Sequence, residues 1–411
     1  MKSKWFDDFF GTGSQGGQEK MATQAQEDAG KYAQDGVNVV EGDTFKHFAG
    51  SLCKSTYRNS PYVEMRDFSM GHFRGPRGFK LKNLPDGCYM DISPDGDGTK
   101  VVLVDAAGDY DNAAYGWVAM VCGDVTRWGG LPLVLVNNLD TETIGKAGEP
   151  VNNAFRAMMK SLKRIADQEN LVMFKGETAE LPGCVASPNP AALCKYLWSG
   201  IAFGVYNPET IITGDNVAED MVVMALRELG LRNNGISSAR KAIVMKFGPD
   251  WSTNPDAQEA IRKAATHAVL YDRFLATANG WFEPDFKPII PMYLIVHVTG
   301  GAIKSKFAED ILFPRGLSAS LNNLWDPPEI MRQCAEWRGM DDEDCYKTWH
   351  GGQGALAVIA EKDAQKFTEL AARFNIEARR AGTIFKPKPG GKPAVYIASK
   401  FNGKTITWTA K

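Results

Sequence analysis

Three short acidic segments rich in glycine are the parts of this sequence best suited to chemistry. They are "PDGDGTK" (Pro94 to Lys100), "CGD" (Cys122 to Asp124) and "KGETAELPG" (Lys175 to Gly183). A few carboxylates and water can hold the Mg²⁺ ion that neutralises a nucleotide's phosphates, and glycines let backbone N–H groups approach phosphate oxygens. A lysine such as Lys100 adds a positive charge. Together the segments predict a metal–phosphate site.

Each segment taken alone has a simpler interpretation. "DGDGTK" is more often a turn, and it differs from a calcium loop because position twelve counted from Asp95 is Ala106 rather than an acid. Asp124 alone is typical of a helix cap or a solvated carboxylate, and "GETAELPG" alone can begin a helix near Thr178. His297, on the apolar "LIVHVTGG", is by itself most often a core residue. The joint occurrence of the three segments favours a ligand site.

The elements that position these segments follow from hydrophobic periodicity. In the first half, "AAYGWVAMVCGDVTRWGG" and "NNAFRAMMKSLKRIADQEN" have helical spacing, whereas "LPLVLVNNLD", "LVMF" and "YLWSGIAFGVY" are typical of strands. We therefore expect the three acidic segments in turns at the ends of strands or helices. In the second half, "MVVMALREL" and "LIVHVTGGAI" predict strands, Ala257 to Ala278 predicts a long helical segment, and the last part predicts strand–helix–strand.

Bulk properties narrow the class of protein. A chain of 411 residues is long enough for two domains. A formal charge of -2 without a basic stripe gives no reason to expect nucleic acid. Seven scattered cysteines without a CxxC pair favour a reducing, cytoplasmic location. No apolar run reaches the length of a membrane span, and residues 1–30 are expected to be a flexible arm.

In this order the motifs resemble those of the aminoimidazole ribonucleotide synthetase (phosphoribosylformylglycinamidine cyclo-ligase) family. The family's Asp-Gly-Val-Gly-Thr-Lys corresponds to "DGDGTK", and its Gly-Glu-Thr-Ala-Glu-Met-Pro-Gly is nearly verbatim in "GETAELPG". Further matches are "KYAQDGV", "VAMVCGDVTRWGGLPL", "TGDNVAEDMVVMAL", "GLRNNG", "HVTGGAI" and "YKTWHGGQGAL". The resemblance spans roughly residues 30 to 395.

The resemblance implies a two-domain fold of the α/β plus α+β class. It places an N-terminal ATP- and metal-binding α/β domain at residues 31–206 and a C-terminal α+β domain at residues 207–411. It also implies a homodimer in which the N-terminal strands of two subunits form a barrel, with ATP bound in the cleft between the domains. No nucleic-acid or membrane partner is expected.

The implied activity is the ATP-dependent ring closure of formylglycinamidine ribonucleotide to aminoimidazole ribonucleotide in purine biosynthesis. The implied cofactors are ATP and Mg²⁺, with K⁺ left open. By the same resemblance the metal ligands are Asp95, Asp124 and Glu177, and the catalytic residues are His297, Arg232 and Lys100. The implied nucleotide-binding residues are Gly96, Asp97, Gly98, Thr99, Lys100, Gly176, Thr178, Asn234 and Gly235.

Five positions depart from the family pattern, and they keep other functions open. The departures are Ala33, Asp97, Gly123, Arg232 and His350. Arginine in place of histidine substitutes a permanent cation for a group that titrates near neutrality, so Arg232 can bind a phosphate but not act as an acid or base. The alternatives are another ATP-using enzyme of the superfamily (a small-molecule kinase or a phosphate-activating synthetase) and a nucleotide-binding paralogue without turnover.

Overall fold

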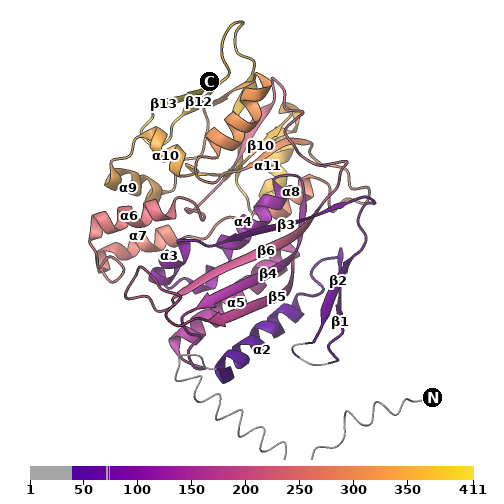
Figure 1. Ribbon diagram of the computed structural model, residues 1–411. Helices are drawn as coiled ribbons and strands as arrows, with labels where there is room; N and C mark the ends of the chain where they lie inside the picture. The colour runs from indigo at the N-terminus through magenta and orange to yellow at the C-terminus, as the bar shows by residue number, and fades with distance from the viewer. Residues whose placement is uncertain (1–38, 71–72, 74) are drawn as a thin grey trace, which may run out of the picture.

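The computed structural model describes residues 39–70, 73 and 75–411, and two separate sheets dominate it (Figure 1). The predicted arm at residues 1–30 and the departure at Ala33 lie outside the described residues. Within the described part, no helix is long and apolar enough to cross a membrane. All seven cysteines are free thiols.

The N-terminal half is built on a four-stranded sheet in the order β3-β6-β4-β5. β4 and β5 are parallel, whereas the other two pairs are antiparallel. Its strands are β3 (Tyr89–Gly96), β4 (Leu131–Thr141), β5 (Val172–Glu180) and β6 (Tyr196–Tyr206). The other elements of this half are α2 (Val39–Ser55), the hairpin of β1 (Val63–Asp67) and β2 (Arg77–Leu81), α3 (Lys100–Ala107), α4 (Tyr115–Thr126) and α5 (Pro150–Glu169).

Helices α4 and α5 cover one face of this sheet because each presents large apolar side chains to it (Figure 1). On α5 these side chains recur at helical spacing and are fully or almost fully buried: Phe155, Met158, Met159, Leu162 and Ile165. On α4 the indole of Trp117 lies against β6 at Gly200, where a Cβ atom would be only 2.2 Å from the ring. Glycine at position 200 is therefore what lets α4 approach the sheet.

The C-terminal half is built on a seven-stranded sheet in the order β13-β12-β9-β11-β7-β10-β8. Side chains of β7 alternate between its faces: Val222, Met224 and Leu226 pack with α8 and α11, and Val223 and Ala225 pack with the π-helical segment η3. The strands are β7 (Val222–Arg227), β8 (Met292–His297), β9 (Ser318–Leu321), β10 (Gln353–Ile359), β11 (Ala378–Phe385), β12 (Ala394–Ala398) and β13 (Thr405–Thr409). The covering elements are α8 (Asp272–Ala278), η3 (Ile303–Leu312) and α11 (Ala364–Arg373).

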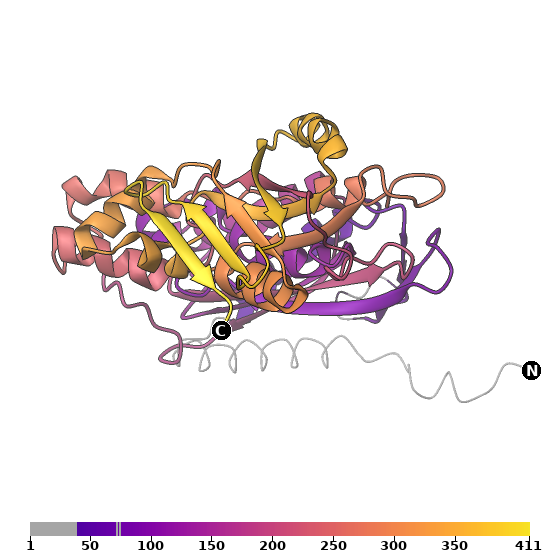
Figure 2. The same ribbon diagram turned by 90° about the horizontal axis from the view of Figure 1, so that it is seen from above.

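A group of helices joins the two halves. Helices α6 (Ile236–Phe247), α7 (Gln258–Ala265) and α9 (Glu329–Arg338) belong to the second half and form a block at one end of the molecule (Figure 2). Their apolar residues share one buried core with Leu103 of α3. The last strand of the N-terminal sheet ends at Tyr206 and the first strand of the C-terminal sheet begins at Val222, so the predicted domain boundary at residue 206 falls where the sheets divide. The boundary itself stays a prediction, because one hydrophobic core contains residues from both halves.

Most of the predicted elements are confirmed, and "PDGDGTK" lies as predicted at the end of β3 and in the turn before α3, but the acids of the other two segments lie within regular elements. "GETAE" lies within β5 and not in a turn after it, because β4 is long enough to pair with it as far as Thr141↔Glu180. Gly123 and Asp124 lie inside α4, and Asp95 and Gly96 end β3. The predicted helical segment Ala257 to Ala278 is two helices, α7 and α8, separated at residues 266–271.

Candidate functional site

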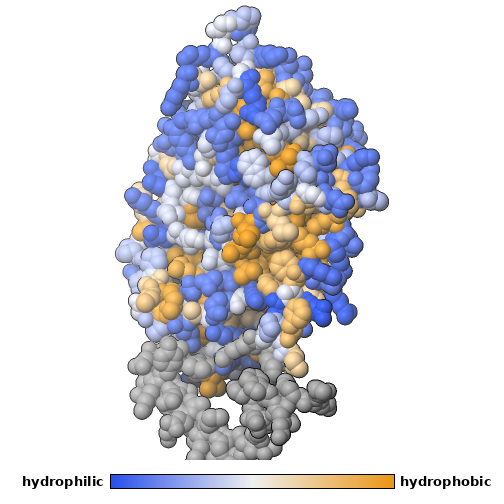
Figure 3. Space-filling view, turned by 45° about the vertical axis from the view of Figure 1, so that its right-hand side comes forward, coloured by the Kyte–Doolittle hydropathy of each residue, from blue (hydrophilic) through white to orange (hydrophobic). Residues whose placement is uncertain are grey.

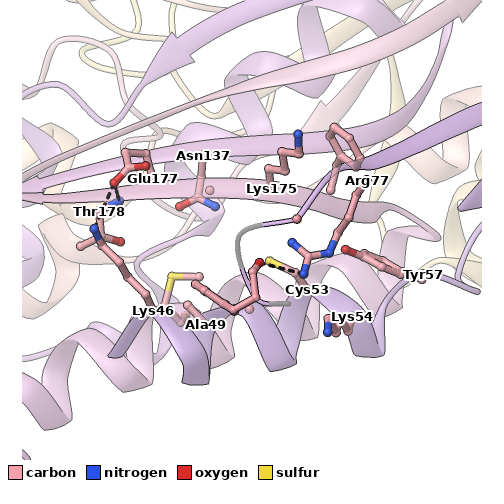
Figure 4. A pocket seen from close by; sticks show the side chains of 16 residues that line it. Lys46, Ala49, Cys53, Lys54, Tyr57, Arg77, Asn137, Lys175, Glu177 and Thr178 are labelled. Carbon is pink, nitrogen blue, oxygen red and sulfur yellow. Dashed lines mark hydrogen bonds and ion pairs between the residues drawn. The ribbon is translucent and has the colours of Figure 1, made fainter. Parts of the chain in front are cut away.

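A pocket of about 350 Å³ lies between α2 and the β4–β5 edge of the N-terminal sheet (Figure 4). Its α2 wall is one helical face, because Lys46, Ala49, Gly50 and Cys53 recur at intervals of three or four residues, and Tyr57 continues this wall just after the helix ends. The opposite wall carries the "KGET" part of β5, with Asn137 of β4 beside it. The pocket therefore places the most family-like motif of the sequence against a helix that begins at Val39.

The charge lining this pocket is mainly positive. Four cations line it, namely Lys46, Lys54, Arg77 and Lys175, and Glu177 is the acid among its lining residues. Lys46 Nζ lies 3.3 Å from Glu177 Oε1, and Asp67 lies outside the lining, 3.8 Å from Lys54 and 3.4 Å from Arg77. An excess of lysine and arginine favours a ligand with several negative charges, such as a phosphorylated one.

Glycine 176, predicted to bind nucleotide, has a packing reason for its identity. A Cβ atom at this position would lie 2.5 Å from Asn137 Nδ2. Asn137 is buried, and its Oδ1 accepts a hydrogen bond from Trp198 Nε1 at 3.3 Å. Thr178, the other predicted nucleotide-binding residue on β5, lines the pocket together with Gly176.

Two of the predicted metal ligands lie at the other edge of the sheet. Asp95 ends β3 and Asp124 lies on α4, and the positive charge of Lys306 acts on both. Partial burial raises the pKa of Asp95, and the charge of Asp124 raises it further. Burial also opposes the charge of Asp124, but His297, Lys306 and Arg127 outweigh it and lower the pKa of that carboxyl.

The predicted set of three metal ligands is not assembled within one chain. Asp95, Gly200, Asn137 and Gly176 form one row across the four strands, so three strand spacings, about 14 Å, separate β3 from β5 at this level. Among the described residues, no three His, Cys, Asp or Glu side chains are grouped so that they could hold a metal ion. The prediction that Glu177 joins Asp95 and Asp124 is therefore wrong for a single chain.

The loop from Gly96 to Lys100 buries the side chains of Asp97 and Lys100, whereas Gly98 between them is exposed. Asp97 is buried and accepts a hydrogen bond from Asn233 Nδ2 at 3.0 Å, and burial raises its pKa to about 7. Gly98 has a left-handed φ of 52°, and Thr99 Oγ1 lies 2.9 Å from Ser237 Oγ.

Lys100 is also enclosed. Its Nζ donates to the carbonyl oxygens of Ala264 and Thr266 at 3.0 and 2.9 Å, and burial lowers its pKa to about 8. The ammonium group binds the C-terminal end of α7, because the end of a helix presents carbonyl oxygens that attract a cation. The role of Lys100 toward a nucleotide stays a prediction.

Arg232 is enclosed in a network formed by residues of the C-terminal half and is not open to a substrate phosphate. Its Nη1 donates to Glu228 Oε2 at 2.6 Å and to the Val269 carbonyl at 3.0 Å, and its Nη2 lies 2.7 Å from His297 Nε2. The side chain of Glu228 is 0% exposed and that of Arg232 is 2% exposed. The prediction that Arg232 anchors substrate is therefore not supported by its position.

The remaining predicted residues have structural contacts as well. His350 Nε2 donates to the Gly230 carbonyl at 2.9 Å, and its Nδ1 accepts from the Gly352 N–H at 3.0 Å. Burial lowers the pKa of His350 to about 4, so the ring is neutral. Asn234 Nδ2 donates to Met120 Sδ at 3.4 Å. Gly235, at φ 70°, has the Trp349 indole within 2.4 Å of the position a Cβ would take.

Comparison with known proteins gives similarity along most of the chain. The chain is 25% identical over 368 residues to a phosphoribosylformylglycinamidine cyclo-ligase of Citrifermentans bemidjiense, and the aligned region covers 87% of this chain and 96% of the relative. It is 26% identical over 327 residues to the enzyme of that name from Methanocaldococcus jannaschii, covering 77% and 85%. The chain is thus similar over most of its length to enzymes named phosphoribosylformylglycinamidine cyclo-ligase. No family model matches it.

The fold is shared more widely. The thiamine-monophosphate kinase of Stenotrophomonas maltophilia K279a superposes with a TM-score of 0.53 at 14% identity, covering 87% of this chain and 96% of that structure. At such low identity the likeness concerns the fold alone, which mixes helices and strands as predicted.

Sequence reasoning missed several charged residues of these sites. Lys46 and Lys54 are eight residues apart on α2, a spacing that places two cations on similar faces of a helix and could have been found. Glu228 and Lys306 gave no such signal. Glu228 meets Val269 and Tyr271 of its own half through long-range packing, whereas Lys306 acts on Asp95 and Asp124 across the two halves.

Proposed function

We propose that this protein is an ATP-dependent phosphoribosylformylglycinamidine cyclo-ligase. The observation that carries the proposal is the similarity to enzymes of that name over 87% of this chain and 96% of the relative, with the "GET" part of "GETAELPG" on a pocket wall. In the reaction, the γ-phosphoryl group of ATP is transferred to the amide oxygen of formylglycinamidine ribonucleotide, releasing ADP. An internal nitrogen then forms the ring C–N bond as the C–O bond breaks and phosphate leaves. Such chemistry depends mainly on positioning and charge neutralisation.

We assign the two sites to different parts of this task. The pocket with its four cations takes a phosphorylated ligand, with Lys46, Lys54 and Lys175 as the side chains that would meet phosphate oxygens. Asp95 and Asp124 would hold Mg²⁺, which commonly uses one or two carboxylates together with phosphates and water. Their fit to a cation is supported by the repulsion between the two carboxylates, since the charge of Asp124 adds to burial in raising the pKa of Asp95.

We also propose that the chain is a homodimer that pairs through the open face of the N-terminal sheet. This face carries exposed apolar side chains on two neighbouring strands, Met90 and Ile92 on β3 and Leu197 and Ile201 on β6. Figure 3 shows apolar side chains gathered at mid-height on the surface of the molecule. An exposed apolar sheet face of this kind favours association with a complementary surface. The strand barrel across the dimer is the arrangement that the family resemblance predicts.

A coupled assay tests the activity. Purified protein is mixed with Mg-ATP and formylglycinamidine ribonucleotide, and ADP and aminoimidazole ribonucleotide are measured together. Equal amounts of both products are expected. ADP without the imidazole product would indicate a kinase or a different phosphate-activating enzyme, and bound ATP with neither product would indicate a paralogue without turnover. This last alternative is favoured by one observation, the enclosure of Lys100 and Arg232.

A matched pair of variants tests the pocket. Lys46→Met removes a cation that pairs with Glu177 at 3.3 Å, and Lys80→Met removes one that pairs with Glu64 at 3.1 Å outside the pocket. Loss of one charge-assisted contact to phosphate costs about 1.5 kcal/mol, so Lys46→Met should raise the KM for a phosphorylated substrate about tenfold. Lys80→Met should leave it unchanged. Equal effects of the two variants would exclude the pocket as the ligand site.

A further inference from the structure

Two of the departures from the family pattern lie on opposite sides of a single imidazole. On one side, a Cβ atom at Gly123 would be 2.8 Å from His297 Cε1 and Nδ1, so the ring needs a glycine there. On the other side, Arg232 Nη2 lies 2.7 Å from His297 Nε2. The altered residues thus enclose His297 between α4 and the end of β8 and fix its position.

The contact with Arg232 determines which nitrogen of His297 carries the proton. A guanidinium group has only donors, so Nε2 must be the acceptor and the neutral ring carries its hydrogen on Nδ1. Nδ1 lies 3.8 Å from Asp124 Oδ1, beyond hydrogen-bond distance. Within the described residues it is a buried polar atom without a hydrogen-bond partner. The ring therefore presents an unused N–H toward a carboxylate that is about two-fifths exposed.

Arg232 is itself held in place from behind. The buried carboxylate of Glu228 accepts from Arg232 Nη1, from Tyr271 Oη at 3.1 Å and from the Val269 N–H at 3.2 Å. The backbone of Arg232 has a left-handed φ of 50°, which is uncommon for a residue with a side chain. With Nη1 held by Glu228, the guanidinium group is oriented so that its Nη2 points toward His297.

We infer that Glu228, Arg232 and His297 form a positioning unit that orients the carboxylate of Asp124 for a metal ion by presenting the His297 Nδ1–H to Oδ1. Outer groups of this kind fix the orientation of a ligand and typically alter metal affinity ten- to a hundredfold. The inference rests on the proposed function only in taking Asp124 as a metal ligand. Arg232 is a positioning residue and not a substrate anchor.

The tautomer can be measured on the unaltered protein. In a ¹⁵N-labelled sample, long-range ¹H–¹⁵N NMR distinguishes the two ring nitrogens of each histidine, and the signals of His297 are those that disappear in a His297→Asn variant. Protonated Nδ1 with unprotonated Nε2 is expected. The opposite tautomer, or a doubly protonated ring at pH 7, overturns the inference without any assumption about activity.

Two variants of His297 separate positioning from packing. His297→Asn places an amide N–H near Nδ1 and loses the Arg232 contact, whereas His297→Gln keeps an acceptor for Arg232 and loses the donor to Asp124. The dissociation constant of Mn²⁺ is measured by electron paramagnetic resonance in the presence of ATP, after thermal unfolding has shown that both variants are folded. His297→Gln should weaken Mn²⁺ binding ten- to a hundredfold, and His297→Asn should stay within about threefold of the unaltered protein.

The outcomes distinguish this inference from the proposed function. Unchanged Mn²⁺ affinity in His297→Gln, or equal weakening in both variants, overturns the positioning role while ATP-dependent metal binding by the unaltered protein stands. Absence of Mn²⁺ binding by the unaltered protein overturns the metal role of Asp124 and counts against the proposed function. The NMR measurement then still decides the orientation of His297.

Discussion

The buried ion pair between Glu228 and Arg232 gives the sharpest stability prediction. Glu228→Gln keeps the size of the side chain but removes its charge and one of its acceptor atoms, and it leaves the Arg232 guanidinium buried without a counter-ion. The pair is 2.6 Å apart, and neither side chain is more than 2% exposed, so solvent screening does not reduce the effect. Removing one partner of such a pair costs about 3–5 kcal/mol.

Urea unfolding followed by tryptophan fluorescence measures this loss. With an m-value of about 3 kcal/mol/M, the transition midpoint should fall by about 1 M or more. The matched control is Glu377→Gln, which removes the partner of Arg227 from an equally short pair, 2.7 Å, whose side chains are about half exposed. Exposed pairs contribute about 0–1 kcal/mol, so the control should shift the midpoint by less than a third as much. A Glu228→Gln midpoint that matches the control would refute the assignment of Arg232 to a buried structural network.

Three further predictions concern pH, packing and assembly. Burial lowers the pKa of His350 from 6.5 to about 4, so between these pH values the unfolded chain binds more protons than the folded one. As pH falls from about 6.5 to about 4, this residue should therefore lower the free energy of unfolding progressively, by up to about 3 kcal/mol. The Tm difference between the unaltered protein and His350→Asn should change over that window, and a constant difference would contradict the prediction. Gly200→Ala, whose Cβ would lie 2.2 Å from the Trp117 ring, should lower stability by about 1–3 kcal/mol in urea, whereas Gly42→Ala, whose Cβ would lie 3.6 Å from Glu180 Oε2, should not. Ile201→Glu should convert a dimer into monomers in sedimentation velocity, and an unaltered protein that already sediments as a monomer would exclude the proposed dimer.

Helices and strands whose buried side chains follow a regular hydrophobic pattern could be predicted from the sequence. Helix α5 was predictable because Phe155, Met158 and Leu162 recur on one face, and β4 because it is a long β-branched and aliphatic run. "GETAE" was predicted as a turn because its glycine and acids disfavour strands. Pairing with the neighbouring β4 overrode that local preference, as Asn138↔Glu177 shows.

The misplaced side chains share a different cause. In sequence, "GLRNNG" resembles an open turn that could offer an arginine to a phosphate. In the structure, the partners of Arg232 come from positions 37 and 65 residues farther along the chain, Val269 and His297. Lys100 likewise meets Ala264 and Thr266. No local pattern reports such contacts, because those of Arg232 depend on long-range packing within the C-terminal half and those of Lys100 on the packing of that half against α3.

The departures from the family pattern are therefore better explained together than one by one. Asp97 accepts a hydrogen bond from Asn233, the residue directly after Arg232. His350 hydrogen-bonds to the carbonyl oxygen of Gly230, two residues before Arg232. Gly123 makes room for the ring that Arg232 contacts. Random decay of an unused site would leave such replacements unrelated to one another, whereas four of the five lie in one connected network at the junction of the halves. That network ends at Asp124, which is partly exposed, so the substitutions fit a rebuilt support for a retained site more closely than the loss of one.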